Sequence, residues 1–189
     1  RKPNTTEVLA SYTWAPYIEG SSDLETLLIA TNVNDVGAER ADSLFDQRHR
    51  FGFSGVMTSP GKWRKGNTFQ KIFSDFTLAP IVEWSSGRPF NIITNVDANN
   101  DQSTQTDRPS VQSDGTLCVP GSAGCTPLIT NGQFSTGNLG RNRGITHSYA
   151  SFDLRITRRV RFNERVNLEL IAEGFNLFNR FNEASATPF

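Results

Sequence analysis

The sequence predicts an all-β fold, an antiparallel up-and-down meander that forms a segment of a transmembrane β-barrel with long extracellular loops. Apolar and polar residues alternate in several segments, long and short connections alternate between them, and aromatic residues gather near their ends. The alternative is a soluble or secreted β-sandwich that binds glycan or protein through its long loop. Both remain open because alternation alone does not reveal whether the apolar face meets a core or lipid.

The composition of the 189-residue chain excludes several classes of protein. Lys plus Arg and Asp plus Glu both number 19, so the net charge is zero and we expect no nucleic-acid partner. No stretch approaches the ~18 apolar residues of a membrane-spanning helix. The first residues, RKPNTTEV, lack the apolar region of a signal peptide and do not begin with Met. We therefore expect a fragment or a processed chain.

Five segments have a period of two and are expected to form strands, because successive side chains leave opposite faces of a strand. In chain order they are residues 5–17, 48–58, 68–84, 148–160 and 165–178. Pro80 counts against the third strand, since proline cannot donate to a ladder and prefers an edge or a bulge. Residues 24–33 fit either an additional strand or a helical turn.

The alternation divides the side chains of these strands between two faces, and even-numbered residues of the last two strands belong to the apolar one. The residues expected to face lipid are Phe51, Phe53, Phe152, Leu154, Ile156, Val166, Leu168 and Leu170. The charged residues expected to face a polar lumen are Arg48, Arg50, Asp75, Glu83, Asp153, Arg155, Glu169 and Glu173. We expect Arg48 and Arg50 to form ion pairs with acidic residues of this second set. Such pairs would satisfy buried charge rather than supply much stability.

The connections between the strands alternate in length. Residues 18–47 and 85–147 form long connections, whereas 59–67 and 161–164 are short. In an up-and-down meander both long loops lie at one end, as in outer-membrane barrels with short periplasmic turns and long extracellular loops. A compact soluble domain rarely contains so long a connection without regular structure. Trp14 and Trp84 near the long-loop end, and Trp63 and Phe162 near the other, would suit aromatic girdles at two membrane interfaces.

Six motifs occur in order along the chain. They are FDQRHRF (45–51), SSGRPF (85–90), DANNDQSTQTDRP (97–109), GRNRG (140–144), FDLRITRRV (152–160) and AEGFNLFNRFN (172–182). Over residues 5–185 the chain thereby resembles the C-terminal part of the β-barrel of Oar-like TonB-dependent receptors of Gram-negative bacteria. The resemblance implies a place in the cell outer membrane, contact with its lipid, and a non-enzymatic role as wall and extracellular loops of a receptor or transporter. It also implies the TonB system, the remaining barrel strands and the plug as partners, since single-chain barrels start at ~8 strands.

One constellation in the second long loop suggests a cation. Asp97, Asn99 and Asp101 follow the D-x-N-x-D spacing that begins many calcium loops, and Asp107 could add another oxygen. A complete EF-hand loop is excluded, because its sixth and twelfth positions would be Gln102 and an arginine instead of Gly and Glu. A looser calcium loop and a solvated Asx-rich turn are the alternatives. No cofactor other than calcium is expected.

The two cysteines, Cys118 and Cys125, bracket VPGSAG. The spacing fits a small disulfide loop or two free thiols, and we expect the disulfide, which would place the segment in an oxidising compartment. No further Cys or nearby His completes a zinc set. His49 has no evident partner for catalysis, and the chain lacks a nucleophile elbow, a phosphate loop and a dinucleotide fingerprint. We therefore expect no enzymatic activity.

Overall fold

The computed structural model describes residues 6–20, 30–31, 35–125, 129–131, 134–163 and 165–183. The chain divides into two compact units. The sheet unit comprises Arg1–Trp14, His49–Ser86 and Ser148–Asn182, and the loop unit comprises Ala15–Arg48, Gly87–His147 and Glu183–Phe189. The segment 24–33, for which a strand or a helical turn was expected, lies outside the described residues except for positions 30 and 31.

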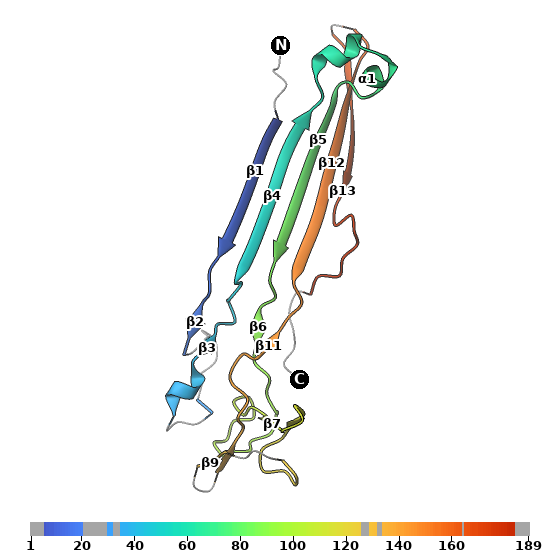
Figure 1. Ribbon diagram of the computed structural model, residues 1–189. Coiled ribbons are helices and arrows are strands. Elements are labelled where there is room, and N and C mark those ends of the chain that lie inside the picture. Colours follow the sequence, from blue (N-terminus) through green and yellow to red (C-terminus); the bar gives the residue numbers. More distant parts are fainter. Residues whose placement is uncertain are drawn as a thin grey trace. The chain divides into compact units, whose positions relative to one another are not determined.

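The sheet unit contains one five-stranded antiparallel sheet (Figure 1). Its strands, in spatial order, are β1 (Thr6–Trp14), β4 (His49–Thr58), β5 (Phe76–Ser85), β12 (Tyr149–Arg161) and β13 (Asn167–Gly174). Each strand pairs with the long strands that precede and follow it in the chain, so the predicted all-β up-and-down meander is confirmed. The other sheets of the described residues have two strands each, so the β-sandwich alternative lacks a second layer.

The first half of the predicted strand 68–84 is wrong. The chain there forms the helical turn α1 (Thr68–Ile72), which follows η2 (Gly61–Lys65) in the predicted short connection, and β5 begins only at Phe76. Asn67 begins the helix with a capping box: its side chain accepts a hydrogen bond from the Gln70 N–H at 2.9 Å, and the Gln70 side chain accepts one from the Asn67 N–H at 3.2 Å. These local hydrogen bonds override the period-two pattern.

Pro80 lies inside the sheet, contrary to the preference of proline for an edge. Its partner on β12 is Leu154. On the other side, the register between β4 and β5 runs to Ser54↔Ile81 and resumes only at Met57↔Leu78. The interruption falls where Pro80 has no N–H to donate. The sheet therefore accommodates the proline by a local break in one ladder.

The two long connections contain short elements. Two-stranded ladders join β2 (Ile18–Glu19) to β3 (Ala41–Asp42), β6 (Pro89–Phe90) to β11 (Gly144–Ile145), β7 (Ser110–Val111) to β8 (Leu117–Cys118), and β9 (Ile129–Asn131) to β10 (Phe134–Thr136). The 3₁₀ turn η1 covers Val36–Glu39. In the part of the chain that the structure describes, no helix has the length and apolar character needed to cross a membrane.

Polar side chains dominate the buried positions of the loop unit. They are Thr31, Glu39, Ser43, Asp46, Asn99, Asp107, Arg108, Ser110, Arg141 and Asn142. The long strands, in contrast, expose large apolar side chains such as Leu9 and Trp14, at 68% and 63% of their surface. Hydrogen bonds and ion pairs therefore hold the loop unit together, and the sheet carries its apolar side chains on the surface.

Candidate functional site

The register places an apolar face across all five long strands, because directly opposed residues of an antiparallel pair share a face. Phe51 is opposed to Tyr12 and Trp84, and Ile156 to Leu78 and Ala172. The residues predicted to face lipid that lie within strands are all on this face: Phe51, Phe53, Phe152, Leu154, Ile156, Leu168 and Leu170. Val166 lies just before β13. A soluble monomer rarely exposes so continuous an apolar surface.

The opposite face of the sheet carries the charged residues, with Leu9, Ile81 and Ile171 among them. Arg50, Glu83, Asp153, Arg155, Glu169 and Glu173 share it, as the alternation predicted. Two ion pairs cross from β12 to β13: Arg155 contacts Glu173 at 3.2 Å, and Arg159 contacts Glu169 at 2.7 Å. Opposite charges are therefore paired across β12 and β13 on this face.

Two predicted members of the charged face lie elsewhere. Arg48 precedes β4 and pairs with Asp42 and Asp46 of the loop unit, both at 2.9 Å. Asp75 lies in the turn before β5 with a φ of 61° and contacts Arg64 at 2.7 Å. The predicted pairing of Arg48 with acidic residues of the sheet is wrong, because the strand begins one residue later and Arg48 finds nearer carboxylates in its own loop.

Aromatic side chains lie at both ends of the sheet. At the end from which the long connections leave, the Tyr12 hydroxyl and His49 Nδ1 are 2.7 Å apart, and Phe178 stacks on Phe152. At the other end, the Arg158 guanidinium lies 5.0 Å from the centre of the Phe76 ring. Arg158 is an even-numbered residue on the apolar face and therefore an exception to the predicted assignment. Its place near the strand end suits a long side chain that carries its charge toward an interface.

The acidic constellation of the second long loop is brought together. Asp97, Asp101 and Asp107 each direct one carboxylate oxygen into a cluster in which these atoms lie within 4.8 Å of one another. The loop is wound by its own backbone: Asp97 accepts hydrogen bonds from the N–H groups of Asp101 and Gln102, both at 3.0 Å. The Asn99 side-chain oxygen also accepts from Asp101 N–H, at 3.0 Å.

Asp107 has the most perturbed environment of these residues. Only 1% of its surface is exposed, and its Oδ2 accepts one hydrogen bond from the Ala98 N–H at 3.0 Å. Burial, together with the nearby charges of Asp101 and Asp97, raises the pKa of the Asp107 carboxyl to about 6, although backbone hydrogen bonds oppose this shift. The site thus places one buried carboxyl beside two half-buried ones.

Sequence reasoning missed a buried ion pair beside this cluster. Arg108 donates to both carboxylate oxygens of Glu39, at 2.7 and 2.9 Å, and to the Leu139 carbonyl at 3.0 Å. Burial opposes ionisation of Glu39, but the hydrogen bonds and positive charge of Arg108 lower its pKa below the ordinary value. Asn142 of the GRNRG motif donates to the Asp42 carbonyl at 2.8 Å. Both contacts join the two long connections, and no sequence periodicity links such distant residues.

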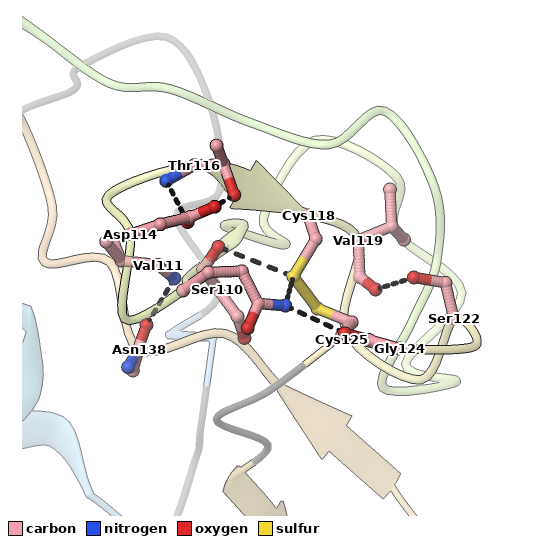
Figure 2. The surroundings of a disulfide bond; sticks show 11 residues. Ser110, Val111, Asp114, Thr116, Cys118, Val119, Ser122, Gly124, Cys125 and Asn138 are labelled. Atoms are coloured by element: carbon pink, nitrogen blue, oxygen red, sulfur yellow. Dashed lines mark hydrogen bonds between the residues drawn. A yellow bond between two sulfur atoms is a disulfide. The ribbon is translucent and has the colours of Figure 1, made fainter.

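A disulfide joins Cys118 to Cys125, with their Cα atoms 5.6 Å apart (Figure 2). Around it, Gln112 donates to the Gly124 carbonyl at 3.1 Å, and the Ser122 hydroxyl to the Val119 carbonyl at 2.7 Å. Nearby, Asp114 accepts hydrogen bonds from the N–H and hydroxyl of Thr116, at 2.9 and 2.7 Å, and Asn138 accepts one from the Val111 N–H at 2.8 Å. This part of the loop unit is therefore locally constrained.

Comparison with known proteins identifies one family. The model of that family, described as "Outer membrane beta barrel domain", matches residues 1–187. A search of curated proteins and a search of solved structures found no match. The match covers nearly the whole chain, including both the sheet unit and the loop unit.

Proposed function

Because the chain belongs to the family of outer-membrane β-barrel domains, we propose that its sheet unit is barrel wall and its loop unit the extracellular surface of a TonB-dependent receptor. The protein is located in the outer membrane. Within that membrane we propose a non-enzymatic role: the extracellular loops bind a substrate, and the intact barrel transports it.

The observation that carries the proposal is the two-faced sheet. One face is apolar from β1 to β13, with its apolar side chains half-buried or exposed, whereas the other carries paired charges. Strands of outer-membrane barrels present this alternation, with apolar residues toward lipid and polar residues toward the lumen. Hydrocarbon would cover the apolar face without a second layer of protein.

The two outer strands indicate further partners. In the described sheet β1 and β13 each pair on one side only. In hydrocarbon the unpaired backbone groups of an open edge each cost several kcal/mol, by order of magnitude. We therefore expect further barrel strands to flank both edges. The plug and the TonB system are expected partners on a separate ground, namely the resemblance of the six ordered motifs to Oar-like receptors.

Single-cysteine labelling tests the orientation. Val36 in η1 and Lys62 in η2 are exposed residues of short 3₁₀ turns, one in a long connection and one in a short connection. A membrane-impermeant maleimide should label Val36→Cys on intact cells, but Lys62→Cys only after the outer membrane is permeabilised. The two variants are matched controls for each other, and the reverse pattern would refute extracellular long loops.

Cross-linking inside cells tests the receptor role. The protein that carries this chain should cross-link to TonB at the level of a known TonB-dependent receptor, and a general porin of the same cells should not. A yield equal to that of the porin would exclude TonB dependence. The assignment of the sheet to a barrel wall would stand in that case, because it rests on different observations.

A further inference from the structure

The acidic cluster of the second long loop contains a buried carboxylate oxygen without a hydrogen-bond donor among the described residues. This atom is Asp107 Oδ1, and only 1% of the surface of this residue is exposed. Buried polar atoms in folded proteins are nearly always paired, because an unpaired one forfeits its hydration. An unpartnered carboxylate oxygen beside two further carboxylates therefore points to a bound cation.

No described side chain supplies that positive charge. The nearest candidate in the chain, Arg108, directs its guanidinium to Glu39 and to the Leu139 carbonyl. Each Asp97 oxygen accepts one backbone N–H, and Asp101 Oδ1 accepts the Ser103 N–H. Asp101 Oδ2 accepts the Asn99 amide at 3.1 Å and the Thr106 hydroxyl at 3.4 Å, and a carboxylate offers about four lone pairs in total. Oxygen lone pairs thus remain at the centre of the cluster.

We propose that Asp97, Asp101 and Asp107 bind a calcium ion. Calcium binds oxygen at about 2.3–2.6 Å, so two oxygens on one ion lie at most about 5.2 Å apart. The observed separations of up to 4.8 Å fall within this limit. The cluster contains only carboxylates and offers no His or Cys ligand, which argues against zinc. Calcium tolerates an irregular set of six to eight oxygens, whereas magnesium demands near-octahedral geometry.

The backbone of the loop supports this choice. Asp97, Asn99 and Asp101 occupy the first, third and fifth positions of a calcium loop. Gln102, at the sixth position, adopts a φ of 70°, the left-handed conformation that glycine provides in EF-hand loops. Asp107 lies one position before the terminal acidic residue of that pattern. The conformation of Gln102 therefore compensates for the missing glycine, whereas the terminal glutamate of an EF-hand has no counterpart in this loop.

The proposed site also joins the two long connections. The Asn99 side-chain amide donates to the Thr31 carbonyl at 2.9 Å, and the Thr31 hydroxyl donates to the Thr106 carbonyl at 2.9 Å. Because Asn99 and Thr106 lie within the loop that carries the three carboxylates, calcium binding should stabilise the attachment of residue 31. We expect calcium to protect both connections from proteolysis.

Calorimetric titration with calcium chloride tests the proposal. The detergent-purified protein that carries this chain, stripped with a chelator, should bind calcium with a Kd below about 1 mM. Asp101→Asn and Asp107→Asn should each remove one equivalent of bound calcium or weaken it at least tenfold. Asp114→Asn is the matched control: this exposed aspartate of the same loop accepts hydrogen bonds from Thr116 and lies outside the cluster, and its substitution should leave the titration unchanged.

The pattern of variants decides the outcome. Calcium titrations of Asp101→Asn and Asp107→Asn that match the wild-type titration would overturn the proposal. Limited proteolysis without calcium checks that each variant keeps its fold. If Asp107→Asn unfolds the loop unit, the calcium titration of Asp101→Asn alone decides the proposal. Asp101 is half-buried, and its asparagine variant keeps an oxygen that can accept the Ser103 N–H.

Discussion

At the scale of single residues, Glu39 and Arg108 explain how the loop unit holds together with so few buried apolar side chains. Their side chains are only 8% and 6% exposed, and both N–H···O contacts are shorter than 3 Å. A buried ion pair adds little stability compared with an apolar pair of the same volume, but the loss of one partner leaves an uncompensated charge. The pair therefore enforces the position of the first long connection against the second.

The pair yields a prediction for a single substitution. Arg108→Met should destabilise the loop unit by roughly 3–5 kcal/mol, because the Glu39 carboxylate would stay buried without its two donors. Hydrogen exchange of loop amides in the detergent-purified protein measures this change. The double variant with Glu39→Met should recover much of the loss, and Arg143→Met, at an exposed position of the same unit, should have little effect. Equal exchange in the single and double variants would contradict the role of the pair.

At the scale of elements, the sheet shows which features the sequence can predict. Alternation predicted the faces of β12 and β13 because every strand residue experiences one of two environments. It failed at residues 68–75, where the capping box between Asn67 and Gln70 begins a helical turn. It also failed at Arg158, a charged residue on the apolar face near the strand end. Alternation also gave no indication of the interrupted ladder at Pro80, which depends on the register of the neighbouring strand.

The faces predict a positional effect of charge. Ile156 lies near the middle of β12, between Leu78 and Ala172 of the neighbouring strands. Leu168 is opposed to Val160, near the end of the sheet that carries the short connections. Ile156→Arg should therefore cost about 2–4 kcal/mol in lipid, and Leu168→Arg only about 0–1 kcal/mol. Folding titrations in lipid vesicles measure the difference.

Neighbouring positions on the polar face are the controls for these substitutions. Thr157→Arg places the same charge one residue along β12, and Glu169→Gln weakens only an exposed ion pair. Both variants should fold nearly as well as the wild type, since exposed ion pairs contribute about 0–1 kcal/mol. Equal losses in Ile156→Arg and Thr157→Arg would show that the two faces do not differ in environment.

At the scale of the whole molecule, the chain is stabilised in two different ways. The sheet unit consists of five strands joined by four ladders of backbone hydrogen bonds, with an apolar face, and the loop unit of polar contacts, short ladders and one disulfide. The sequence predicted that the long connections exist and that Asp97, Asn99 and Asp101 belong together, because these residues are close in the chain. It could not predict the contacts of Glu39 or Asn142, which depend on how two distant segments meet.

This division predicts that the two units respond differently to loss of the disulfide. Replacing Cys118 and Cys125 together by Ser should destabilise the loop unit by about 2–3 kcal/mol, because the disulfide no longer restricts the conformations of a short loop in the unfolded chain. Protease cleavage near residues 110–125 should become faster. The heat-modifiable electrophoretic mobility of the assembled protein should not change, because both cysteines lie in the loop unit. Failure of the variant to assemble would refute the separate stabilisation of the two units.

The ladder between β6 and β11 has a consequence for the order in which the strands form. Phe90 is opposed to Gly144, where a Cβ atom would overlap the Phe90 ring, and Thr146 N–H donates to the Arg88 carbonyl at 2.9 Å. These contacts join the two ends of the longest connection a few residues from β5 and β12. If they form first, the loop that must close before β12 pairs with β5 becomes far shorter, which lowers the entropic barrier by about 2 kcal/mol. The pairing of β5 with β12 would then proceed almost as rapidly as that of an ordinary hairpin.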